Sequence, residues 1–157
     1  MNKLVICCTA ALMLLSACTW LQDQEEKPAD VLIKEGVDAY NAGDFDDAIE
    51  AFEQLRDWYP FSKYAILAEL KVADAHFELG HYEEAVYAYE EFEQLHPRNE
   101  AIPYVIYQIG LCHFRRIDTV DRDQTPAQKA LDTFNRLQQQ FPDDPYALSA
   151  SDHITTS

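Results

Sequence analysis

Apolar residues recur at spacings of three and four along the chain from Asp30 onward, and glycine or proline interrupts this pattern at intervals. Such spacing places apolar side chains on one face of an α-helix, and glycine and proline end helices. No stretch alternates apolar and polar residues over a useful length, so we expect an all-α fold. The expected helices cover residues 30–42, 45–58, 62–79, 82–95 and 102–116, and another opens at 125.

The helical pattern itself repeats with a period of 37 residues. Small residues recur at that period, and aromatic residues recur in phase with them: Gly36, Ala73, Gly110 and Tyr40, Phe77, Phe114. A fixed period of this length is typical of a solenoid, in which each helical hairpin buries its apolar face by stacking on its neighbours. Such scaffolds usually bind segments of other proteins, which favours a binding function over a catalytic one.

The third unit departs from this period. A polar segment, 117–124, follows its first helix where the earlier units have a glycine turn. The distance between equivalent alanines grows from 37 residues between Ala48 and Ala85 to 45 between Ala85 and Ala130. Because a longer loop on one face of a solenoid often contacts a partner, we expect 117–124 to be a contact loop.

The N-terminal residues have the composition of a processing and tethering segment. Lys3 precedes an uncharged apolar run of 12 residues, 4–15, which is shorter than the roughly 20 residues of a membrane-spanning helix. The Leu-Ser-Ala-Cys that ends at Cys18 resembles the lipobox of bacterial lipoproteins, and this implies that the cysteine becomes the acylated first residue. Residues 1–17 would then be a lipoprotein signal peptide and 18–29 a lipidated flexible tether. The alternative is an ordinary secretory signal with an incidental cysteine.

Thr19 follows that cysteine, where many inner-membrane lipoproteins have an aspartate. By this resemblance the chain is expected at the outer membrane, lipid-anchored on its periplasmic face. Each buried methylene of the acyl chains would contribute about 0.8 kcal/mol to anchoring.

The formal net charge of −16 argues against binding to nucleic acid and against electrostatic adhesion to anionic lipid. The five histidines show no repeated metal-ligand spacing, and Cys112 is the one cysteine beyond Cys18, so we predict no metal and no cofactor. The chain has no nucleophile elbow, phosphate-binding glycine loop or CxxC pair. We therefore expect a protein that is not an enzyme.

The hairpins resemble tetratricopeptide repeats, in which small residues lie where the two helices of a hairpin approach closely. Aromatic residues follow at one position of each second helix, and prolines close the units: Phe52, Tyr89, Phe134 and Pro60, Pro97, Pro142. The resemblance implies a domain over residues 30–157 with three repeats and the start of a fourth.

Four segments are more specific: Trp-Tyr-Pro-Phe-Ser-Lys-Tyr-Ala at 58–65, Leu-His-Pro at 95–97, Tyr-Val-Ile-Tyr-Gln-Ile-Gly-Leu at 104–111 and Asp-Arg-Asp-Gln at 121–124. With the lipobox, they resemble the BamD-type family of outer-membrane protein assembly lipoproteins. That resemblance implies a periplasmic scaffold that binds unfolded β-barrel proteins for insertion into the outer membrane. It also implies docking on the barrel-forming subunit of the assembly complex. The alternative is a general tetratricopeptide adaptor for cell-envelope or peptidoglycan machinery.

The resemblance also implies two further repeats, whereas residues 144–157 offer only the start of one more helix, so the chain is expected to be C-terminally shortened. A terminal repeat needs a polar outer face. The last complete repeat has little left to cover its apolar edge, formed by Ala130, Leu131, Phe134 and Leu137. We expect either a truncated gene product or an edge that another chain covers.

Residues on the first helix of each repeat are expected to line the concave face and form a peptide-binding groove. The preferred peptide-binding residues are Tyr40, Phe77 and Tyr107, because an apolar groove with aromatic walls suits an extended segment rich in aromatic residues. The alternative is that these side chains only pack adjacent helices together.

Overall fold

The computed structural model describes residues 26–117 and 124–154. These residues form seven α-helices and no strand, which confirms the all-α prediction. The bounds are α2 (Ala29–Ala42), α3 (Phe45–Trp58), α4 (Ala65–Glu78), α5 (Tyr82–Leu95), α6 (Ile102–Arg115), α7 (Thr125–Gln140) and α8 (Pro145–Ile154).

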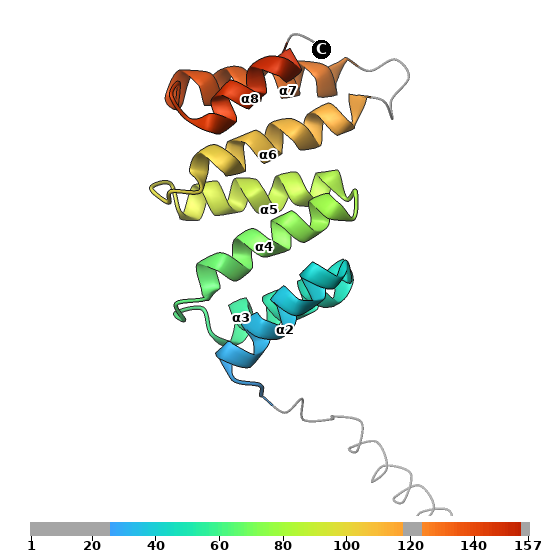
Figure 1. The fold of residues 1–157 in the computed structure, drawn as a ribbon, viewed down its shortest axis with the longest axis vertical. Helices are drawn as coiled ribbons and strands as arrows, with labels where there is room; N and C mark the ends of the chain where they lie inside the picture. Colours follow the sequence, from blue (N-terminus) through green and yellow to red (C-terminus); the bar gives the residue numbers. More distant parts are fainter. Residues whose placement is uncertain (1–25, 118–123, 155–157) are drawn as a thin grey trace, which may run out of the picture.

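The hairpins stack in chain order along the long axis of the molecule, and α8 lies beside α7 at one end (Figure 1). Each helix packs against the next one along the chain, and α6 also packs against α8. The pairs α2–α3, α4–α5 and α6–α7 are the three predicted hairpins, and α8 starts a fourth. Because the main contacts of each hairpin are with its neighbours along the chain, the described residues form a helical-hairpin solenoid.

Glycine turns close the first two hairpins, as predicted. Gly43 and Gly80 adopt φ angles of 85° and 76°, in the left-handed region that glycine enters without steric cost. The Gly43 N–H donates to the Tyr40 carbonyl oxygen at 3.1 Å, and the Gly80 N–H donates to Phe77 at 3.0 Å. These bonds end α2 and α4 and reverse the chain within a few residues.

The second helices α3 and α5 have the predicted bounds, whereas α4 begins at Ala65 and not at Ser62. The Ser62 hydroxyl accepts a hydrogen bond from the Tyr64 N–H at 3.2 Å, and its carbonyl accepts one from the Ala65 N–H at 3.1 Å. This local turn uses the backbone groups that an earlier helix start would need.

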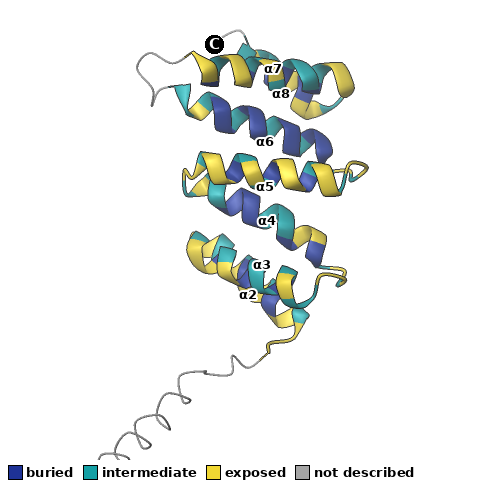
Figure 2. Ribbon diagram, turned by 180° about the vertical axis from the view of Figure 1, so that it is seen from behind, coloured by how far each residue is buried: buried dark blue, intermediate teal, exposed yellow. Residues whose placement is uncertain are grey.

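The close approach of paired helices depends on small residues opposite aromatic rings. A Cβ atom added at Gly36 would overlap the Phe52 ring, and one added at Gly110 would overlap the Phe134 ring. Both rings are fully buried. The middle hairpin has Ala73 and a buried Tyr89 at the equivalent positions. Figure 2 shows that burial is most continuous along α6, the first helix of the third hairpin, which packs between α5 and α7.

The predicted apolar edge on the last complete repeat is wrong for three of its four residues. Ala130, Phe134 and Leu137 are fully buried, whereas Leu131 is partly exposed, and α8 packs against α7. His153 of α8 stacks on the Phe134 ring at a centroid distance of 5.5 Å, and the Gln138 amide donates to the Ser151 hydroxyl at 2.8 Å. The short helix α8, which starts the fourth repeat, thus covers much of α7. At this end of the molecule, Leu148 of α8 is a large apolar side chain that is 65% exposed.

Several predictions lie outside the described residues. The signal peptide (1–17), the lipidation site Cys18 and most of the tether (18–29) precede residue 26, and most of the expected contact loop is within 118–123. Ala29, the last residue assigned to the tether, is already the first residue of α2. Within the described part of the chain, no helix combines the length and apolar character needed to cross a membrane.

Candidate functional site

The structure does not bring the three predicted peptide-binding residues together in one cluster. Tyr40 packs edge-on against Phe45 across the first turn, with ring centroids 5.3 Å apart, and Phe77 packs against Tyr82 across the second at 5.6 Å. The two pairs are equivalent in successive repeats. Both residues are partly exposed at the ends of first helices and also stabilise the turns.

Tyr107 lies in a different setting, at the junction of α6 with α8. Its ring lies 6.0 Å from Phe134 and 5.4 Å from Tyr146, and its hydroxyl lies 3.2 Å from Nε2 of His153. The repeat equivalent of Tyr40 and Phe77 in the third unit is Phe114, whose ring lies 5.0 Å from His153. Helix α8 therefore covers part of the surface that the sequence suggested for peptide binding.

A buried carboxylate occupies the middle of the first-helix face. Asp74 on α4 is only 3% exposed. Its Oδ1 accepts hydrogen bonds from the Tyr89 hydroxyl at 2.7 Å and the Tyr104 hydroxyl at 2.8 Å, and its Oδ2 accepts one from Lys71 at 2.8 Å. Three donors around one carboxylate satisfy the charge that burial would otherwise penalise.

This network connects three successive hairpins. The Lys71 ammonium lies 4.8 Å from the centroid of the Tyr40 ring on α2, and the Gln108 amide donates to the Tyr104 hydroxyl on α6 at 2.8 Å. Burial, followed by the charges of Asp74 and Glu78, raises the pKa of Tyr40 to about 12. Burial is also the main cause that raises the pKa of the Tyr104 hydroxyl, so this hydroxyl is a stable donor at neutral pH.

The sequence analysis did not predict this role of Asp74. Two signals could have indicated it. Asp74 is a lone acid on an otherwise apolar helix face, with Lys71 one turn before it. Tyr89 is also the one hydroxylated residue among the three equivalent aromatic positions of the second helices.

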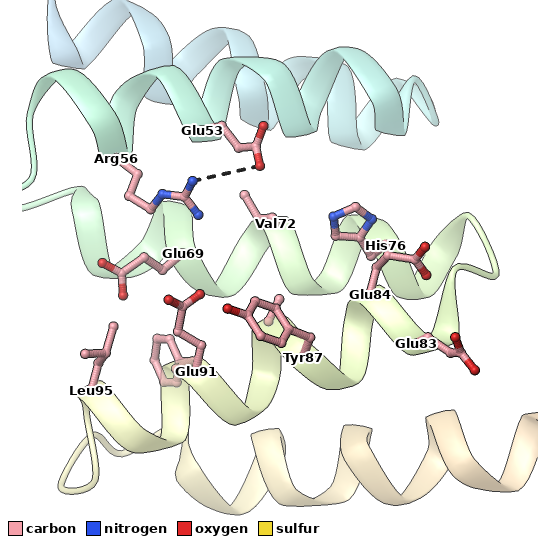
Figure 3. A pocket seen from close by; sticks show the side chains of 12 residues that line it. Glu53, Arg56, Glu69, Val72, His76, Glu83, Glu84, Tyr87, Glu91 and Leu95 are labelled. Atoms are coloured by element: carbon pink, nitrogen blue, oxygen red, sulfur yellow. Dashed lines mark ion pairs between the residues drawn. The ribbon is translucent and has the colours of Figure 1, made fainter. Parts of the chain in front are cut away.

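A cavity of about 790 Å³ lies on the other side of α4, between α3 and α5 (Figure 3). Its floor includes Glu69, Val72 and His76 of α4. At 3.6 residues per turn these side chains point nearly opposite to Asp74, so the cavity and the first-helix face are separate surfaces. The sequence analysis did not predict this cavity, because it depends on how far α3 and α5 diverge.

The charged side chains of the cavity walls are mostly acidic. Five glutamates line it, and the cations on its lining are Arg56 and, when protonated, His76. Arg56 lies 3.9 Å from Glu53, which Figure 3 marks with a dashed line, and 3.2 Å from Asp57. At one end, Glu69 lies 2.5 Å from Nε2 of His96.

The nucleophilic and metal-binding potential of the described residues is low. Cys112 is fully buried, and burial raises the pKa of its thiol to about 12, so it is a packing residue rather than a reactive thiolate. Within residues 26–117 and 124–154, no group of three or more His, Cys, Asp or Glu side chains could hold a metal ion.

Comparison with known proteins agrees with this architecture. Residues 25–156 match the YfiO family, which is described as an outer membrane lipoprotein. The chain belongs to this family. It is 29% identical over 126 residues to the outer membrane protein assembly factor BamD of Caulobacter vibrioides, an alignment that covers 80% of this chain and 41% of that protein. It is 31% identical over 151 residues to the BamD of Vibrio cholerae, with 89% and 63% covered.

The family assignment confirms the resemblance seen in the sequence. The chain spans about two fifths to three fifths of the length of these curated relatives. Among solved structures, the Arabidopsis OM64 TPR domain superposes with a TM-score of 0.62 at 13% identity and covers 82% of this chain and 94% of that domain. The first TPR of Spaghetti (RPAP3), solved with an HSP90 peptide, superposes with a TM-score of 0.60 at 19% identity, covering 82% and 90%. These similarities confirm the tetratricopeptide-repeat fold.

Proposed function

We propose that this chain is a scaffold of the outer-membrane protein assembly complex, where it binds unfolded β-barrel proteins and helps to deliver them for insertion into the outer membrane. The observation that carries the proposal is the family match over residues 25–156, together with relatives that are themselves named outer membrane protein assembly factors. The partners are then the barrel-forming subunit of the complex and its unfolded substrates.

The first-helix face is the surface proposed to bind these substrates. It presents partly exposed aromatic and apolar side chains on α2, α4 and α6, among them Tyr40, Phe77, Tyr107 and Leu67, which is 42% exposed. An unfolded barrel strand alternates apolar and polar side chains, so its apolar side chains could contact this face while the polar ones stay in water.

The scaffold is proposed to be held on the periplasmic face of the outer membrane by lipid at Cys18. The lipobox-like sequence before this cysteine supports the anchor. Mass spectrometry of the mature protein from its native host should find an acylated N-terminal Cys18. An unmodified Cys18 in that protein would refute the anchor.

Photo-crosslinking in living cells tests the substrate surface. A photoreactive phenylalanine analogue at Tyr40, Phe77 or Tyr107 should crosslink to newly exported β-barrel proteins. The matched control position is Glu90, which is exposed on α5 outside the first-helix face. Crosslinks to barrel proteins at Glu90, with none at the three aromatic positions, would overturn the assignment of this surface.

Affinity purification of the full chain tests the complex. Recovery of the barrel-forming subunit is the expected result. Recovery of peptidoglycan synthases without that subunit would instead favour the general adaptor function.

A further inference from the structure

The cavity between α3 and α5 has features that the proposed function does not use. On its α5 wall, Glu84, Tyr87, Glu91 and Leu95 follow one another at spacings of three and four, so they form one stripe along the helix. Tyr87 is 70% exposed and Leu95 is 59% exposed, which is high for large apolar side chains in a partly enclosed site. Figure 3 shows the Tyr87 ring on the wall between the Glu84 and Glu91 side chains.

Two carboxylates on this stripe, Glu84 and Glu91, lie outside the ion pairs of the cavity, although the charge of Glu84 acts on His76 and opposes the lowering of its pKa by burial. Within the described part of the chain, the other three glutamates of the cavity each have a partner of opposite charge or a histidine partner. These pairs are Glu53 with Arg56, Glu69 with His96, and Glu83 with Arg116. Glu84 and Glu91 form no ion pair with any residue that the structure describes. A hollow lined by one sign of charge concentrates the electric field and attracts a ligand of the opposite sign.

We propose that this cavity binds an extended, arginine-containing segment of another protein. Three other occupants fit less well. A metal ion would need a cluster of ligands, and none is found among the described residues. A second copy of this chain would bring another net charge of −16, and nucleic acid or anionic lipid would be repelled by the glutamates.

The spacing of the stripe defines the segment. Glu84 and Glu91 are seven residues apart on α5, which is about 10.5 Å along the helix axis. In an extended segment, residues four apart lie on the same side, separated by roughly 13 Å. Long, flexible arginine side chains can span the small difference between this separation and that of the two glutamates. The residue midway between them points the same way and would lie on Tyr87. An Arg-x-apolar-x-Arg segment therefore matches the Glu84, Tyr87 and Glu91 stripe.

Arginine suits this wall better than lysine. Its planar guanidinium can form two parallel hydrogen bonds to one carboxylate, whereas the lysine ammonium acts as a point charge. Peptides that differ only in Arg or Lys therefore test the chemistry of the site as well as its charge.

The probe is a fluorescein-labelled peptide, Gly-Arg-Ala-Leu-Ala-Arg-Gly amide, titrated with the full chain in an uncharged detergent and followed by fluorescence polarisation. Binding should weaken strongly when salt is raised from 50 mM to 500 mM, because exposed charges are screened. Replacement of both arginines by lysine should weaken binding severalfold, and replacement by glutamate should abolish it. If the glutamate peptide binds as well as the arginine peptide, the proposal is wrong.

Paired variants locate the site. Glu84→Gln with Glu91→Gln should weaken binding of the arginine peptide at least fivefold, and Tyr87→Ala should weaken it about threefold. The matched control is Glu90→Gln with Glu100→Gln, two exposed glutamates outside the cavity that change the net charge by the same amount, and it should weaken binding less than twofold. All four carboxylates are exposed, so the variants should keep the circular dichroism spectrum of the parent.

Equal losses in the two pairs would show only a diffuse charge effect and would overturn the site. Light scattering should find that the Glu84 and Glu91 variant leaves the oligomeric state unchanged. A dimer that this variant dissociates would identify a second copy as the occupant and would also overturn the proposal. The inference is independent of substrate binding at the first-helix face, so these variants should retain the crosslinks from Tyr40 and Phe77.

Discussion

His113 is a buried residue whose protonation should make the stability of the fold depend on pH. It is 6% exposed on α6, and burial, reinforced by the positive charges of Lys129 and Arg116, lowers the pKa of its imidazole to about 4. In the unfolded chain this pKa would be near 6.5, so between pH 6.5 and 4 the unfolded state binds more protons than the folded state. Acidification through that range therefore favours unfolding.

The variant His113→Leu tests this residue. As pH falls from 7 to 4, the free energy of unfolding of the parent should decrease more than that of the variant, by on the order of 3 kcal/mol. Urea denaturation at several pH values, followed by circular dichroism, measures the difference. Parallel pH profiles for parent and variant would mean that the imidazole is charged or exposed in the folded state.

At the scale of elements, the Asp74 network should join the second and third hairpins. Asp74→Ala leaves the Tyr89 and Tyr104 hydroxyls and Lys71 without their shared acceptor, and it should lower the free energy of unfolding by roughly 2–4 kcal/mol. Tyr89→Phe removes one hydroxyl and should cost about 1 kcal/mol.

A double-mutant cycle distinguishes a network from independent contacts. Urea denaturation of the two single variants and the double variant should give a coupling energy of at least 0.5 kcal/mol, because both changes remove the same hydrogen bond. Additive losses would show that Asp74 and Tyr89 stabilise the fold independently.

The same element scale explains which features the sequence could predict. Bounds of α3 and α5 follow from a glycine turn before each helix and a proline shortly after it, and both are local signals. The start of α4 was missed because the Ser62 hydroxyl and carbonyl form a local turn that competes with the first turn of the helix. Asp74 and the cavity beside Tyr87 were missed because they depend on the distance between helices of different hairpins, which a periodic pattern does not encode.

At the scale of the whole molecule, stability should be distributed locally along the solenoid. Each helix packs on its sequence neighbours, and the additional pairing of α6 with α8 lies within the last hairpins. Residues 145–154 of α8 pack on α7, where His153 stacks on the buried Phe134 ring. A disturbance at one end should therefore weaken the adjacent hairpin more than the distant one.

Two equivalent glycines allow a reciprocal test of this locality. Gly110→Ala places a methyl group into the Phe134 ring, and Gly36→Ala does the same at Phe52, so each should cost about 1–3 kcal/mol through overpacking. Hydrogen–deuterium exchange of Gly110→Ala should accelerate in α6, α7 and α8 and stay unchanged in α2 and α3, and Gly36→Ala should give the opposite pattern. If either variant accelerated exchange equally in all seven described helices, the molecule would unfold as one cooperative unit, and neighbour-only packing would not set its stability.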